Sequence, residues 1–145
     1  MSTFSEEHLE LLKRHQAAEN AHDLEATLAT LADDCVFHDL PSGRRWIGHE
    51  GATEYYQTWW KAFDHRVTSE RLHFPAPHLA IAETRWAGQH VGEYWGIAPT
   101  GRPIDVPVVI FVEIRDGLMA GERFIWDRAS LLTQLGAGPG IWGQA

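Results

Sequence analysis

The sequence has a single cysteine, Cys35, among its 145 residues. One cysteine excludes an intramolecular disulfide and cannot by itself build a cysteine-based metal site, so we expect Cys35 to be a thiol in the core. The first ten residues, MSTFSEEHLE, carry acidic charge and no apolar run. We therefore expect neither a secretory signal nor a membrane span, and the cytoplasm is the expected compartment.

Positive charge is also scarce, because 12 Lys and Arg residues stand against 20 Asp and Glu, which gives a net charge of −8. A field of this sign repels nucleic-acid phosphates and anionic lipid unless a local basic patch overrides it. The densest basic pair, Arg44 and Arg45, lies in a Pro/Gly-rich segment typical of a solvated turn. We expect no nucleic-acid or membrane partner.

Metal-binding motifs are missing as well. The chain has nine histidines, but none forms an H-x-H or H-E-x-x-H pattern with a clear third ligand. The sequence therefore predicts no metal site.

What the chain does have is ordinary globular composition and many aromatic residues. Hydrophobic residues make up 44% of it and charged residues 22%, and its length suits one core rather than two. We expect a single domain over residues 1–145, with a core of about 8–136 and a loosely ordered tail of 137–145. Seven Trp, three Tyr and six Phe can supply rigid walls for an apolar ligand, or can simply pack a core.

Helical patterns come first along the chain. Ser5 can cap a helix running to about residue 22, and a second, shorter helix follows Asp23. In the first helix Leu9, Leu12, His15, Gln16 and Glu19 recur at helical spacing, so we expect it to be amphipathic. A third helix, from residue 48 to about 63, has an unusually aromatic face that includes Tyr56, Trp59 and Trp60, which makes it a candidate roof for a pocket.

Strand patterns dominate the rest. The predicted strands are 35–40, 67–73, 78–90, 91–96, 104–115 and 118–127. Helices followed by strands predict an α+β fold, in which helices pack on one face of an antiparallel sheet.

The dipeptide Asp116-Gly117 predicts a two-residue hairpin turn. In that register Val106 faces Asp127, and Val108, Ile110 and Ile125 share their face of the sheet. Asp127 would then be a carboxylate at the end of an apolar stripe, where desolvation tunes a carboxyl group for general acid/base work. Alternatively, Asp127 only caps a short helix that begins near Ala129.

Three motifs together resemble the SnoaL-like polyketide cyclases. They are GEYWGIAPTGR (92–102), the Asp116-Gly117 hairpin, and Trp126-Asp127 followed by LLTQLG (131–136). The resemblance covers roughly residues 8–136. It implies a strongly curved antiparallel sheet wrapped around the N-terminal helices as a cone with an internal pocket, and frequent dimerisation through the outer face of the sheet.

The resemblance also implies a chemistry. In the cyclases an aspartate at the end of the last strand acts as the acid/base of an intramolecular aldol condensation, and the matching position is Asp127. The substrate's own carbonyls delocalise the enolate, so no cofactor is implied. A hydrophobic small molecule, such as a polycyclic one, is the expected substrate.

The limonene epoxide hydrolases, a sister family in the same cone-fold superfamily, offer the runner-up function. Carried over by position, their acids fall on Asp127 and Glu93, but Phe37, Asp39 and Val91 replace the tyrosine, asparagine and arginine of the hydrolase pattern. These departures put water activation by that mechanism in doubt.

Asp39, Glu93 and Asp127 would on this interpretation share one cavity, where at least one carboxylate should hold a proton. Asp39 can instead form a turn before Pro41, and Glu93 can be an exposed strand residue. His38 is a candidate proton relay if a bulge turns it inward. The remaining expected substrate contacts are Trp95 and Arg123, and Arg123 is expected to be solvated or paired with Asp127.

Three functions remain open from sequence. A cyclase- or isomerase-type enzyme requires a buried Asp127 beside an open apolar cavity. An epoxide hydrolase or dehydratase requires a water held between Asp127 and a second polar group. A non-catalytic binding module would have a pocket filled by its own aromatic residues.

Overall fold

The computed structural model describes residues 4–137. Its helices are α1 (Glu6–Asn20), α2 (Leu24–Leu28), α3 (Gly48–Ala62) and α4 (Arg128–Gln134). Its strands are β1 (Leu31–Asp39), β2 (Arg44–Ile47), β3 (Phe63–Ala76), β4 (Leu79–His90), β5 (Pro103–Arg115) and β6 (Leu118–Trp126). The predicted α+β class is confirmed.

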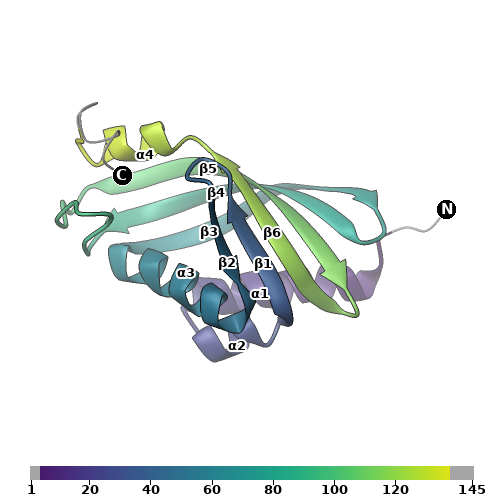
Figure 1. Cartoon of the computed structure of the whole chain (residues 1–145). Helices are drawn as coiled ribbons and strands as arrows, with labels where there is room; N and C mark the ends of the chain where they lie inside the picture. The colour runs from purple at the N-terminus through teal and green to yellow at the C-terminus, as the bar shows by residue number, and fades with distance from the viewer. Residues whose placement is uncertain (1–3, 138–145) are drawn as a thin grey trace.

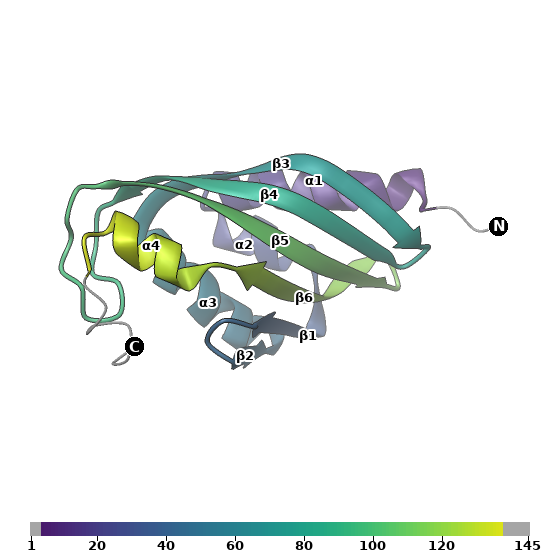
Figure 2. The ribbon, with the colours of Figure 1, turned by 90° about the horizontal axis from the view of Figure 1, so that it is seen from above.

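The six strands form one curved, unclosed sheet in the order β2-β1-β6-β5-β4-β3. The helices α1 to α3 lie on its concave side, and α4 lies near the ends of β5 and β6 (Figures 1 and 2). Neighbouring strands are antiparallel except that β1 runs parallel to β6. This pair departs from the predicted all-antiparallel sheet, because β1 lies beside β6, the last strand of the β3–β6 meander, and runs in the same direction.

Local sequence explains the helix starts. The side chain of Ser5 accepts a hydrogen bond from the His8 amide and caps α1, and Asp23 caps α2 in the same way. The helix α3 begins at Gly48, whose φ of +69° suits glycine. The helix boundaries thus follow the predicted caps.

One predicted strand and one predicted turn differ in the structure. The segment 91–96 is a tight turn rather than a strand: Tyr94 and Ile97 exchange both backbone hydrogen bonds, and Trp95 (φ +49°) and Gly96 (φ +82°) form its tip. Conversely, the expected turn at Arg44 and Arg45 belongs to the short strand β2, and both side chains are exposed.

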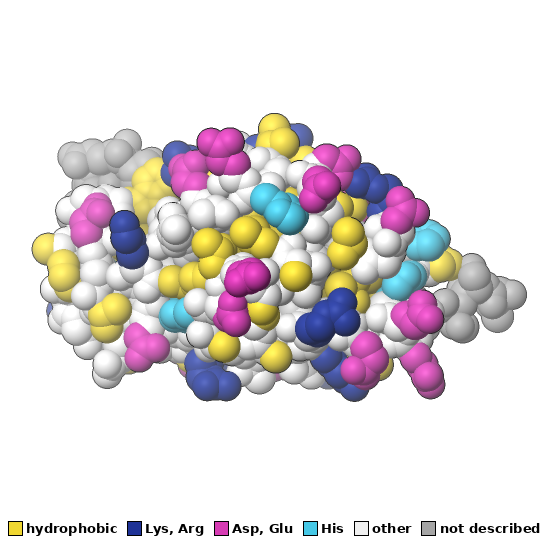
Figure 3. All heavy atoms as spheres, turned by 90° about the horizontal axis from the view of Figure 1, so that it is seen from below, with side chains coloured by type: hydrophobic (Ala, Val, Ile, Leu, Met, Phe, Trp, Pro, Cys, Tyr) yellow, Lys and Arg dark blue, Asp and Glu magenta, His cyan; other side chains and the backbone are white. Residues whose placement is uncertain are grey.

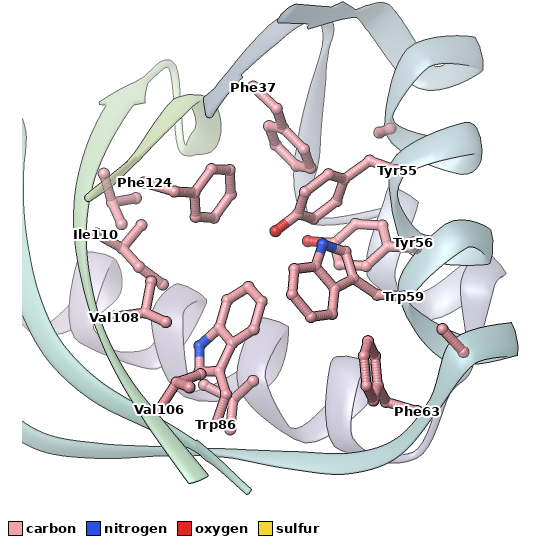
Figure 4. Packing of buried hydrophobic residues seen from close by; sticks show 14 of the residues in the cluster. Phe37, Tyr55, Tyr56, Trp59, Phe63, Trp86, Val106, Val108, Ile110 and Phe124 are labelled. Carbon is pink, nitrogen blue, oxygen red and sulfur yellow. The ribbon is translucent and has the colours of Figure 1, made fainter. Parts of the chain in front are cut away.

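Both α3 and the sheet contribute aromatic side chains to the core. Tyr55, Tyr56 and Trp59 from α3 face rings from the sheet (Figure 4). Phe37 makes edge-on contacts with Tyr55 and Tyr56, and the ring centroids of Trp59 and Trp86 lie 4.8 Å apart. Such contacts stabilise beyond the apolar area that they bury. Much of the space inside the curved sheet is therefore filled by the protein's own rings.

A β-bulge in β6 decides which side chains face inward. Glu113 pairs with Gly121, but Ile114 pairs with Met119, so Ala120 is an extra residue in the ladder. Beyond it Val108 pairs with Trp126, so the predicted register, with Val106 opposite Asp127, is wrong by one residue. A one-residue shift exchanges the faces of a strand.

Candidate functional site

A cavity with a volume of about 340 Å³ lies between α1 and the concave face of strands β3 to β6. Apolar side chains form most of its wall, among them Leu12, Val67, Ile110 and Val112. Ligand pockets are usually apolar clefts of about 300–1,000 Å³ with a few convergent polar groups, so this cavity suits a compact organic molecule. On the side of the helices, hydrophobic side chains reach the surface among charged ones (Figure 3).

Three titratable side chains meet at the wall of this cavity. His15 and Glu19 come from one face of α1, four residues apart, and Glu122 comes from β6. The Nε2 atom of His15 lies 3.3 Å from Oε1 of Glu122 and 3.6 Å from Oε2 of Glu19. Their side chains are only 7%, 5% and 13% exposed for His15, Glu122 and Glu19. We call these three residues the acid/base cluster.

Hydrogen bonds fix the protonation of one ring nitrogen of His15. The hydroxyl of Thr30 donates to the carbonyl of Thr27 at 2.6 Å, so its oxygen is left to accept from Nδ1 of His15 at 2.7 Å. Nδ1 therefore carries a proton, and Nε2 is the atom at which a proton is gained or lost. Tyr56 places its hydroxyl 3.1 Å from Nε2 and faces the neutral ring as a donor.

The surroundings shift these groups toward proton exchange near neutral pH. Burial lowers the pKa of His15, but the close contact with the Glu122 carboxylate outweighs it, so the net shift is upward. Burial raises the pKa of Glu19 to about 7, partly offset by the charge of His15. Burial also raises the pKa of Tyr56 well above its usual value, so Tyr56 keeps its proton. The cluster thus combines a histidine of raised pKa with a carboxyl group whose pKa is about 7.

The three carboxylates predicted to share a cavity do not meet. Asp127 is exposed, and its side chain accepts a hydrogen bond of 3.1 Å from the Ser130 amide, which makes it the N-cap of α4, as the alternative interpretation held. Glu93 is exposed and accepts a hydrogen bond from the Gly96 amide in the turn. The shared-cavity expectation is wrong, and the catalytic roles of these residues stay predictions.

Asp39 is buried, but away from the large cavity. Its carboxylate accepts hydrogen bonds from Nε1 of Trp126 at 2.6 Å and from the amide and hydroxyl of Ser42. It lines a second hollow of only about 20 Å³, together with Trp59 and Trp95, which has room for about one water molecule.

The bulge explains where the other predicted contacts lie. Val108 and Ile110 are buried on the inner face as expected, and Ile110 lines the large cavity. Ile125 and Arg123 are instead on the outer face, where Ile125 is 44% exposed and Arg123 lies over the ring of Phe111. No ion pair joins Arg123 to Asp127 among the described residues.

The predicted aromatic contacts belong to the core rather than to the cavity wall. Phe37 and Tyr56 are fully buried among rings, and Trp60 stacks on Tyr56 and His22. Val91 is 51% exposed beside the turn. His38 is half-buried on the face of β1 opposite to Phe37 and Asp39, because no bulge turns it inward within the β1 segment that holds it.

The sequence analysis found His15 and Glu19 at helical spacing in the first helix but did not assign them to the site. Glu122 was missed, because the simple register places it outside. Gly121 was the available signal, since a glycine inside a strand often marks a bulge or a close backbone approach. A Cβ at this position would lie 3.1 Å from the carbonyl oxygen of Val36.

Comparison with known proteins identifies the family of the chain. A family model described as SnoaL-like polyketide cyclase matches residues 9–135. A candidate SnoaL-like polyketide cyclase from Jannaschia sp. CCS1 has the same fold, with 21% identity over 96% of this chain and 98% of that one and a TM-score of 0.84.

Two Streptomyces structures are also similar. TsrD from Streptomyces laurentii is 26% identical over 91% of this chain and 96% of its own, with a TM-score of 0.79. IdmH from Streptomyces antibioticus, a candidate polyketide cyclase, is 25% identical over 92% of this chain and 100% of its own, with a TM-score of 0.77. No curated protein matches. The family model spans most of the chain, and the chain belongs to the SnoaL-like polyketide cyclase family.

Proposed function

We propose that the protein is an acid/base enzyme of the cyclase or isomerase type, acting on a compact apolar carbonyl compound bound between α1 and the sheet. Family membership supports the reaction class. The observation that carries the proposal is the acid/base cluster, in which three buried titratable side chains meet at an apolar cavity. Pockets with perturbed titratable groups are the usual location of acid/base catalysis.

The proposed reaction is an intramolecular aldol closure in which atoms balance. The Glu122 carboxylate takes a proton from the carbon beside a carbonyl group, and protonated His15 stabilises the enolate oxygen. The enolate carbon then attacks a second carbonyl of the same molecule, and the new alkoxide takes the proton of Glu19. The proton on Glu122 returns to Glu19 through Nε2 of His15, so the product has the mass of the substrate.

Turnover of a panel of polyketide esters and epoxides by the protein and two variants tests this proposal. Glu122→Gln removes the proposed base with little change of shape, and should lower the rate of isobaric product formation by about 10²–10⁴-fold, the usual contribution of a general base. Asp127→Asn is the matched control, because Asn also caps helices and position 127 is exposed. It should leave the rate within about twofold.

Each other outcome would overturn part of the proposal. Loss of activity in Asp127→Asn with full activity in Glu122→Gln would return the catalytic role to Asp127. A product heavier by one water would place the hydrolase first. Ligand-induced thermal stabilisation without any turnover across the panel would favour a binding module.

A further inference from the structure

The polar groups of the large cavity differ in how fully they are engaged. Asn20 is held by two hydrogen bonds to the backbone of Val67, and Gln16 accepts one from Ser69. Thr84 donates to the carbonyl of Val108 and accepts from Trp86. These side chains stabilise the wall of the cavity, and they have few hydrogen-bond donors or acceptors left for a ligand.

The cationic side chain of the cavity is engaged at its rim. Lys13 is 63% exposed, and its Nζ lies 3.3 Å from Oε1 of Glu10. The charges of the two side chains therefore offset each other, and both side chains are solvated. The remaining polar groups that could bind a ligand belong to the acid/base cluster. Within residues 4–137, no hydrogen bond of acceptable geometry reaches Oε1 of Glu122, although His15 lies nearby.

The cluster is short of one positive charge or one proton. Two carboxylates face a single imidazole in an apolar wall, and buried carboxylates are costly unless they are paired or protonated. In the unliganded protein a proton on Glu19 supplies the difference, since its pKa is about 7. A cationic ligand supplies the same charge and adds hydrogen-bond donors for Glu122.

We propose that this cavity binds lipophilic ammonium ions, with the N–H groups on Glu122 and Glu19 and the apolar body along α1. The cavity extends from Leu9 to Asn20 along the helix, about 16 Å at 1.5 Å per residue. Leu9 and Leu12 line the part away from the cluster. The net charge of −8 also favours approach of a cation. The ligand class does not depend on the proposed reaction.

Affinity for the ammonium ion should rise with pH. The groups facing it are Glu122 from β6 and His15 and Glu19 from α1, with the Tyr56 hydroxyl of α3 behind His15 and the Lys13–Glu10 pair at the rim. Of these, Glu19 must lose its proton to pair with the cation. Binding should therefore strengthen between pH 5.5 and pH 8, and release a proton at the lower pH.

Calorimetry with three probes of one shape tests the proposal without requiring turnover. The probes are cyclohexylmethylammonium, cyclohexylmethanol and cyclohexanecarboxylate, at pH 8. We expect the ammonium ion to bind at least tenfold more tightly than the alcohol, and the carboxylate to bind more weakly than both. Equal affinities for ammonium and alcohol, or no binding of the ammonium ion, would overturn the proposal.

Variants locate the site. Glu122→Gln should remove the preference for ammonium over alcohol, and Glu19→Gln, less buried and thus a safer variant for folding, should reduce it and abolish its pH dependence. Glu25→Gln on the exposed face of α2 is the control and should change nothing. If both site variants fold, as judged by circular dichroism, and keep the full preference, the ammonium ion binds elsewhere and the proposal fails.

Discussion

At the scale of single residues, Glu19 should make stability depend on pH. Burial raises its pKa to about 7 in the folded protein, above its value in the unfolded chain. The resulting stabilisation is fully present below the unfolded-state pKa and is lost as pH rises through the folded-state pKa. The raised pKa of His15 acts in the same direction.

We therefore expect the free energy of unfolding of the wild-type protein, relative to Glu19→Gln, to fall by about 3 kcal/mol between pH 4 and pH 8, at about 1.4 kcal/mol per pKa unit. Urea unfolding at several pH values measures this difference. Glu25→Gln should give a curve parallel to wild type. Parallel curves for wild type and Glu19→Gln would mean that Glu19 has an ordinary pKa.

At the scale of elements, the side chain of Asn20 joins α1 to the edge strand β3 by two hydrogen bonds. Asn20 donates from Nδ2 to the carbonyl of Val67 at 2.9 Å, and its Oδ1 accepts from the Val67 amide at 2.7 Å. This pair of bonds imitates a neighbouring strand and covers part of an otherwise open sheet edge. It also fixes one wall of the cavity.

Asn20→Ala should destabilise the protein by about 2–3 kcal/mol, because two partly buried backbone groups lose their partners. Amide hydrogen exchange should show the protection of Val67 falling more than that of Val108 in the sheet centre. Gln57→Ala, at an exposed position of α3, is a control for general helix effects. Unchanged protection at Val67 would show that Asn20 does not hold this edge.

The elements also show how far sequence reasoning reaches. The periodicities of the long helices α1 and α3 and of the strands β3 to β6 follow from local chemistry and were predicted. So were the caps Ser5 and Asp23 and the Asp116-Gly117 hairpin. The strand β2 was not, because four residues bounded by a turn carry no period. For the site, helical spacing grouped His15 and Glu19 in the first helix, but the Ala120 bulge reversed every later side chain of β6 relative to the predicted register. Which face of β6 points inward is decided by how the strand pairs with its neighbours, and no local sequence pattern predicts that pairing.

At the scale of the whole molecule, the curved sheet encloses two different environments. Around α3 the interior is packed with rings, as expected of a binding module, and only a hollow of about 20 Å³ remains beside Asp39. Beside α1 an open cavity of about 340 Å³ remains, as expected of an enzyme, but with Glu122 in place of Asp127. The family fold therefore persists while the ionisable groups that face its cavity are set by the β6 register. No helix of residues 4–137 has the length and apolar character to cross a bilayer.

The central claim is that the acid/base cluster carries an exchangeable proton near neutral pH. The most direct measurement is a ¹³C NMR titration of the glutamate side-chain carboxyl groups, with Glu19 assigned by the signal that Glu19→Gln removes. We predict a midpoint near pH 7 for Glu19, and a lower midpoint in Glu122→Gln, where the neighbouring negative charge is gone and His15 remains. A midpoint near the ordinary glutamate value of about 4.3 would contradict the account, because Glu19 would then have no proton to give at neutral pH.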